Sequence, residues 1–113
     1  MTQNPNLVRG TLDLLILKSL TWEPKHGYGI SEWIEVVTEG ALLMEEGTLY
    51  PALHRLEAKG WIDSEWGLSE NNRRAKYYRR TRAGSQHLER DAESWTRYTA
   101  AVARALEMES PLR

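Results

Sequence analysis

The chain has no cysteine, no phenylalanine and no long hydrophobic run among its 113 residues. The lack of cysteine excludes disulfide bonds, thiolate zinc sites and cysteine nucleophiles together. No apolar stretch reaches the length that spans a bilayer, and residues 1–6 lack the basic segment that opens a secretory signal. We therefore expect a cytoplasmic protein with no membrane partner.

Sequence features of enzymes are also scarce. The three histidines, His26, His54 and His87, do not have the spacing of paired metal ligands, and no glycine-rich phosphate loop occurs. The glutamates between residues 32 and 39 are expected along one exposed side of a helix, which requires no catalytic role. We expect no catalytic residue, no metal ion and no cofactor.

Charge is balanced in total but uneven along the chain. The 15 basic and 16 acidic residues leave a formal net charge of −1, which identifies no partner. A local cationic strip is nevertheless enough for nucleic-acid binding, although a run of charges is more often only a solvated surface. The strip, which contains no acid, comprises Arg73, Arg74, Lys76, Arg79, Arg80 and Arg82.

The stretch Glu45–Ile62 has the pattern of one short amphipathic helix. Its outward face is small near the start and then rich in hydrogen-bonding groups. Gly60 is expected to end the helix, and Pro51 to lie near its first turn, where a missing N–H costs little. The pattern fits a DNA-reading helix, and an ordinary surface helix is the alternative. The apolar positions that share the inward face are Leu49, Ala52, Leu53 and Leu56.

Hydrophobic periodicity predicts a mostly α-helical fold with one small β-hairpin. Three helices precede a change to the period of two, which marks two strands, and Thr81 is expected to cap a long last helix. This order describes a winged helix-turn-helix at residues 1–81 and a C-terminal dimerisation helix at residues 82–113, in one compact unit. The helices are expected at about 10–22, 28–38, 45–59 and 82–108, the strands at 61–66 and 75–81, and a turn at 23–27.

Two helices carry more apolar surface than a chain of this size can cover alone. The first is apolar around most of its circumference, and the last is roughly 40 Å long at about 1.5 Å per residue. We expect both to meet a second copy in a twofold homodimer; the alternative is a first helix that is central in its own chain. The predicted interface residues are Leu12, Leu15, Ile16, Leu88, Trp95, Tyr98, Val102 and Leu106.

Five blocks of sequence stand out between residues 10 and 84. They are Gly-Thr-Leu-Asp-Leu-Leu-Ile-Leu (10–17), His-Gly-Tyr-Gly-Ile (26–30), Gly-Thr-Leu-Tyr-Pro-Ala-Leu-His-Arg-Leu-Glu (47–57), Gly-Trp-Ile (60–62) and Asn-Arg-Arg-Ala-Lys-Tyr-Tyr-Arg-Arg-Thr-Arg-Ala-Gly (72–84). Together these blocks resemble the PadR family of bacterial transcription factors, in its short form with one C-terminal helix. The resemblance implies a winged-helix homodimer that represses operators. Glu45 departs from the usual capping Ser or Asp, and Arg80 from a Leu, which predicts a less buried second strand.

The residue chemistry and the resemblance predict a DNA-binding surface on the third helix and the hairpin. Thr48 is expected to reach a phosphate or a base, and Tyr50 a phosphate. His54 and Arg55 are expected to donate to base edges in the major groove. The hairpin cations are expected on the backbone or in a minor groove, whose potential attracts arginine. The alternatives are a Tyr50 that packs beside the core and an Arg55 that is only solvated. The predicted DNA-binding residues are His26, Tyr28, Thr48, Tyr50, Pro51, His54, Arg55, Arg73, Arg74 and Lys76.

Two of these residues, His26 and Tyr28, begin the second helix, where the helix dipole helps to hold a phosphate. Structural packing of Tyr28 is an equal alternative. A winged-helix module can also bind protein rather than DNA, although the cations disfavour this. If two last helices face each other, paired Trp95 side chains flank a flat apolar slot, which predicts a small planar aromatic effector. The alternative is that Trp95 only packs in the dimer core.

Overall fold

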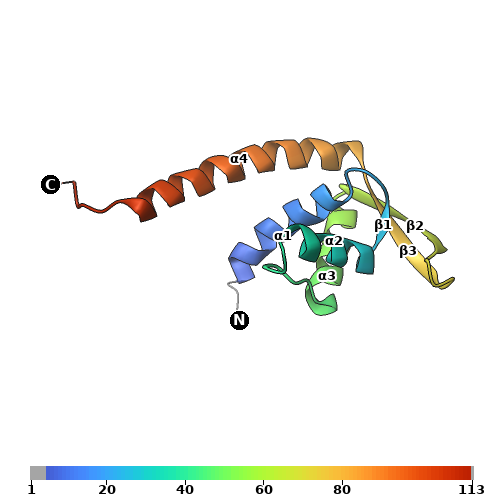
Figure 1. Cartoon of the computed structure of the whole chain (residues 1–113). Helices are drawn as coiled ribbons and strands as arrows, with labels where there is room; N and C mark the ends of the chain where they lie inside the picture. Colours follow the sequence, from blue (N-terminus) through green and yellow to red (C-terminus); the bar gives the residue numbers. More distant parts are fainter. Residues whose placement is uncertain (1–4, 113) are drawn as a thin grey trace.

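The computed structural model describes residues 5–112, which form four helices and a three-stranded antiparallel sheet (Figure 1). The winged-helix class predicted from the sequence is confirmed. No helix in this part of the chain is long and apolar enough to cross a membrane. The elements are α1 (Pro5–Ser19), β1 (Lys25–His26), α2 (Gly27–Val37), α3 (Glu46–Ala58), β2 (Ile62–Leu68), β3 (Arg74–Arg80) and α4 (Arg82–Glu107).

One cluster of buried apolar side chains joins α1, α2, α3 and the sheet. The four residues of α3 in this cluster are the four that the helical spacing predicted, and each is at most 1% exposed. Burial of this face turns the opposite face of α3 outwards. The cluster comprises Leu12, Ile16, Leu17, Leu20, Ile30, Ile34, Leu49, Ala52, Leu53, Leu56, Ile62 and Tyr78.

The sheet has the strand order β1-β3-β2. β2 and β3 form the predicted hairpin, in which Trp66 lies opposite Lys76. β1 is only two residues long and lies opposite Tyr77 and Tyr78 of β3. A turn was predicted at residues 23–27, so the presence of a strand there corrects the prediction. A strand of two residues is too short to show an alternating pattern in the sequence. It forms because its backbone pairs with β3.

α1 begins at Pro5, earlier than the predicted start near Gly10, and ends at Ser19, before the predicted end. Its end tightens because the Thr21 N–H donates to the Lys18 carbonyl at 3.1 Å, three residues back rather than four. The helical spacing of α1 was therefore read correctly, but its boundaries were not.

The predicted interface role of Leu12 and Ile16 is corrected by their burial. These side chains are 3% and 0% exposed within the single chain, so they have no surface to offer a partner. Two further predicted interface residues, Leu15 of α1 and Leu88 of α4, are partly buried and each packs against the core cluster. A second side of α1 is thus covered by α4 of the same chain. This agrees with the alternative in which the first helix is central in its own chain.

Arg80 ends β3 and ties three elements together. Its Nη1 donates to the Leu17 carbonyl at 3.0 Å and to the Thr21 hydroxyl at 2.9 Å. Its Nε donates to the Ser85 hydroxyl at 2.8 Å. Hydrogen bonds to the end of α1 and the start of α4 therefore hold the C-terminal end of β3 in place. The leucine that the family pattern has at this position could do so only by burial.

The start of α4 packs tightly on the turn before β2. The Thr81 hydroxyl accepts from the Gly84 N–H at 3.1 Å and donates to the Gly60 carbonyl at 2.6 Å, so the predicted N-cap is confirmed. A Cβ at Gly84 would lie 2.0 Å from the carbonyl oxygen of Trp61. Because this neighbour is backbone, the direction in which α4 leaves the hairpin depends on a residue without a side chain.

α3 starts without a side-chain cap. Glu45 precedes it in an extended conformation, and its side chain makes no capping hydrogen bond. Pro51 lies inside the helix, five residues after the first helical residue Glu46, and not near the first turn as predicted. The carbonyl of Gly47 therefore has no helical N–H partner, and the interruption lies on the outward side of the helix.

Candidate nucleic-acid interface

The face of α3 opposite the core is exposed along its length. Thr48, Pro51 and His54 lie there about one turn apart, and all three are exposed. His54 has no hydrogen bond or ion pair with the residues that the structure describes. Its ring nitrogens are therefore available to a ligand that approaches this face of α3.

Arg55 has a different environment from the one predicted. Its guanidinium pairs with the carboxylate of Asp13 on α1, and 29% of the Arg55 side chain and 13% of the Asp13 side chain are exposed. A cation in such a pair resists separation, because each charge would lose its counter-ion. In this structure Arg55 is neither an outward base-reading donor nor merely solvated. It instead connects the outward-facing helix to α1.

Tyr50 packs against the start of α2 and keeps 40% of its surface exposed. A Cβ at Gly27 would lie 2.6 Å from the Tyr50 hydroxyl oxygen, so the glycine makes room for the ring. The core-flanking alternative therefore describes part of this side chain. Close by, burial raises the pKa of Tyr78 above its usual value, and the charges of Glu57 and Tyr50 add to this.

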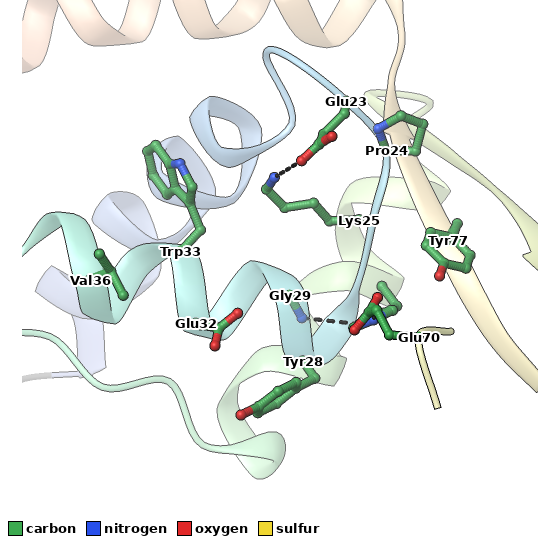
Figure 2. Close-up of a pocket in the computed structure, with 11 residues that line it drawn as sticks. Glu23, Pro24, Lys25, Tyr28, Gly29, Glu32, Trp33, Val36, Glu70 and Tyr77 are labelled. Atoms are coloured by element: carbon green, nitrogen blue, oxygen red, sulfur yellow. Dashed lines mark hydrogen bonds and ion pairs between the residues drawn. The ribbon is translucent and has the colours of Figure 1, made fainter. Parts of the chain in front are cut away.

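The start of α2 gives His26 and Tyr28 different surroundings. Nδ1 of His26 accepts from the Gly29 N–H at 3.0 Å, which caps α2, and Nε2 lies 3.5 Å from a carboxylate oxygen of Glu70. Both ring nitrogens thus have partners in the chain, so this structure does not offer His26 to a phosphate as predicted. Tyr28 is 70% exposed and projects from α2 (Figure 2), so its hydroxyl can reach a ligand.

A hollow of about 520 Å³ between α2 and the hairpin is lined by acidic side chains (Figure 2). Glu23, Glu32 and Glu70 line it, and Lys25, the lining cation, pairs with Glu23 at 3.1 Å. This negative surface repels phosphate. A polyanion is therefore disfavoured inside this hollow.

Half of the cationic strip predicted from the sequence is held by partners within the chain. Lys76 Nζ lies 3.7 Å from a carboxylate oxygen of Glu57 on α3. Arg79 donates to Asp63 at 3.1 Å, and this hydrogen bond raises the pKa of Arg79. Arg80 is bound to α1 and α4 as described above. These three cations therefore attract a polyanion less strongly than unpaired cations would.

The other cations of the strip have no such partner. Arg73, Arg74 and Arg82 are exposed, and none pairs with a carboxylate among residues 5–112. The guanidinium carbon of Arg74 instead lies 4.6 Å from the ring centroid of Trp66. Arg73 belongs to the turn at the hairpin tip, where its N–H lies 3.3 Å from the Ser69 hydroxyl oxygen. The uncompensated charge of the hairpin is therefore concentrated towards its tip.

Asp13 and Trp66 were not among the predicted site residues, although the sequence carries a signal for each. Asp13 is a single acid within the apolar run of α1, a position where a buried charge needs a partner. Trp66 alternates with Ile62 and Ser64 along β2, which places all three on one face. Their partners, Arg55 and Arg74, are identified only by the packing of α1 on α3 and the pairing of β2 with β3.

A second hollow, of about 580 Å³, lies between α1 and α4. Trp95 lines it together with Leu15 and Leu88. The surface beside Trp95 is thus built partly by α1 of the same chain, and not solely by two facing last helices as the predicted slot assumed.

Beyond Trp95, α4 carries apolar side chains that this chain leaves uncovered. Tyr98, Val102 and Leu106 are 61%, 39% and 80% exposed, and their spacing places them on one side of the helix. This part of α4 extends away from the other elements (Figure 1). Exposed apolar patches of this kind are typical of protein–protein interaction sites.

Comparison with known proteins places this geometry in a family. The model of the transcriptional regulator PadR-like family matches residues 16–90. A transcriptional regulator from Clostridium thermocellum is 33% identical, with a TM-score of 0.78 over 88% of this chain and 96% of its own. A PadR family transcriptional regulator from Eggerthella lenta is 34% identical, with a TM-score of 0.74 over 92% of this chain and 88% of its own.

An uncharacterised protein from Lysinibacillus sphaericus is 33% identical over 90 residues, which make up 80% of this chain and 83% of that protein. The family match includes α2, α3 and the hairpin, which carry the residues of the candidate interface. These similarities assign the protein to transcriptional regulators and not to enzymes. The chain belongs to the PadR-like family of transcriptional regulators.

Proposed function

We propose that the protein is a repressor that binds double-stranded DNA as a homodimer, at an operator with two related half-sites. One observation carries this proposal: the exposed face of α3 lies beside a hairpin whose tip holds the uncompensated cations Arg73 and Arg74. In this arrangement a helix enters the major groove while the hairpin follows the adjacent backbone or minor groove. A regulator of chromosomal DNA acts where the chromosome lies, so a cytoplasmic location is part of the proposal.

Apart from Arg73 and Arg74, the predicted DNA-binding residues form two groups with different roles in the proposed complex. Thr48, Pro51 and His54 contact the major groove, and the Tyr28 hydroxyl reaches a phosphate. The second group supports these contacts from behind. It comprises His26, which caps α2, Tyr50, which packs on Gly27, Arg55, which joins α3 to α1, and Lys76, which joins the hairpin to α3.

The homodimer of the proposal forms through the far half of α4. The exposed stripe of Tyr98, Val102 and Leu106 provides apolar surface for an identical stripe related by a twofold axis. Trp95 and Leu88, nearer the start of α4, border the hollow beside α1. Two winged-helix parts on opposite ends of such a dimer match two half-sites about one helical turn apart.

A second candidate function is a winged-helix module that binds protein without DNA. The exposed apolar residues Trp22 and Val36 favour it, because they are 66% and 67% exposed outside α4. The hairpin tip disfavours it, because a surface of uncompensated arginine beside an exposed helix suits a polyanion. Protection of promoter DNA by the purified protein, at physiological salt, distinguishes the two functions.

We expect Val102→Asp to convert the dimer to a monomer, because it places a carboxylate in the apolar interface at a cost of several kcal/mol. Ala100→Asp is the matched control, since residue 100 lies on the opposite side of α4. Sedimentation at micromolar concentration measures the mass of each variant. A well-folded monomer for the unmodified chain would contradict the proposed assembly.

Arg73→Ala and His54→Ala are expected to affect DNA binding differently. Loss of a phosphate contact at Arg73 should weaken all sequences alike and reduce the salt slope by about one unit. Loss of His54 should instead relax the preference at one base pair, by roughly 1 kcal/mol. Arg79→Ala serves as the control, because Arg79 is already paired with Asp63. Equal binding by Arg73→Ala and the parent at every salt concentration would exclude the hairpin contact.

Asp13→Asn is expected to release the charge of Arg55 towards DNA. Non-specific affinity should rise, and the salt slope should steepen by about one unit, because one more cation meets phosphate. Asp63→Asn releases Arg79 on the other face of the hairpin and should leave the slope unchanged. Binding to duplexes of unrelated sequence across a salt series measures the effect. An unchanged slope for Asp13→Asn would show that Arg55 stays on α1 without its counter-ion.

The proposal includes an effector, a small planar aromatic compound that stacks beside Trp95 in the hollow between α1 and α4. Such a compound releases DNA only if the dimer has two arrangements that differ in the distance between its two α3 helices. The compound must then bind the arrangement that does not fit the operator more tightly than the one that does. Fluorescence titration with planar aromatic cations should quench the parent and weaken its operator binding, whereas Trp95→Leu should show neither effect. Equal binding by both proteins, or by neither, would leave Trp95 as a packing residue.

A further inference from the structure

The hairpin exposes an aromatic side chain on the face that carries α3. Trp66 is 57% exposed and lies opposite Lys76. Two residues earlier on the same face, the Ser64 hydroxyl donates to the Glu57 carboxylate of α3 at 2.6 Å. The Trp66 indole therefore extends the α3 side of the protein towards the hairpin tip, beside the proposed DNA.

Arg74 lies over this indole, with its guanidinium carbon 4.6 Å from the ring centroid. The register explains the contact, because Arg74 lies opposite Leu68 and is the diagonal neighbour of Trp66 across the two strands. Stacking uses the flat face of a guanidinium and leaves the N–H donors around its edge unoccupied. The edge of Arg74 can therefore still donate to an acceptor outside the protein.

An aromatic partner differs from an acidic partner in its effect on charge. Lys76 lies 3.7 Å from Glu57, and Arg79 lies 3.1 Å from Asp63, so a carboxylate compensates each of these cations. The indole of Trp66 restricts the guanidinium of Arg74 but carries no charge to neutralise it. Arg74 thus combines a restricted orientation with a full positive charge.

We propose that Trp66 is a positioning residue for Arg74, and that this pair detects the width of the minor groove beside each half-site. The inference rests on the proposed DNA-binding function and adds a sequence preference outside the bases that α3 contacts. Narrow minor grooves of A·T tracts have enhanced negative potential and attract arginine. A guanidinium that is already held in place loses less conformational freedom when it enters such a groove.

The test uses the full chain and two duplexes with one central sequence, selected by the parent protein from a random library. One duplex has A·T tracts as flanks and the other has mixed G·C flanks. The parent should prefer the A·T flanks, and Trp66→Ala should reduce this preference about two- to five-fold, the effect of one exposed cation–π contact. Trp66→Phe should restore most of the preference, because it retains an aromatic face.

Trp22→Ala is the matched control for the loss of an exposed indole. Trp22 is 66% exposed and has Lys18 Nζ 5.3 Å from its ring, but it lies after α1 and outside the hairpin. The flank preference of Trp22→Ala should equal that of the parent. Thermal unfolding of each variant verifies that the hairpin substitutions leave the fold intact.

A double-mutant cycle separates positioning from direct contact. Arg74→Ala should abolish the flank preference, and Trp66→Ala should then have no further effect. A loss that persists without Arg74 would show that Trp66 itself contacts DNA and would overturn the positioning role, as would an unchanged preference in Trp66→Ala. Failure of the proposed function has a different signature, because the parent would then select no duplex, and the inference would fall with it.

Discussion

The architecture depends on the backbone contact at which the hairpin passes into α4. Gly84 packs against the carbonyl of Trp61, and Arg80, one residue before the cap, binds both the end of α1 and the start of α4. Sterics and hydrogen bonds together fix the direction of a 26-residue helix relative to the winged-helix part. In the proposed dimer, which forms through α4, this direction would set the distance between the two α3 helices and with it the spacing of the half-sites.

Internal pairing decides which charges of this nearly neutral chain act on a partner. Asp13 and Asp63 compensate Arg55 and Arg79. The unpaired cations of the hairpin, Arg73 and Arg74, lie towards its tip, while acids line the hollow beside α2. Sorting of this kind gives a protein with a formal net charge of −1 a local field of either sign. The orientation of a bound polyanion follows from this sorting rather than from the total charge.

Local periodicity predicted α2, the buried face of α3, the hairpin and the N-cap of α4, because each depends on residues close together in the sequence. The contacts that were missed join distant segments: Asp13 and Arg55 are 42 residues apart, and β1 exists only through its pairing with β3. The side of α1 that faces the core was also beyond prediction, because spacing cannot select one side of a helix that is apolar nearly all around. His26 was assigned to a ligand because its capping bond is invisible in the sequence.

The uncovered stripe on α4 has a consequence for the response of a gene to this regulator. If only the dimer binds DNA, its amount at low concentration rises with the square of the amount of chain. Occupancy of the operator then changes more steeply than synthesis of the protein does. A modest fall in the concentration of the regulator would derepress the gene, and a modest rise would repress it. Tyr98, Val102 and Leu106, which never approach DNA in such a dimer, would thus set the threshold of the genetic switch.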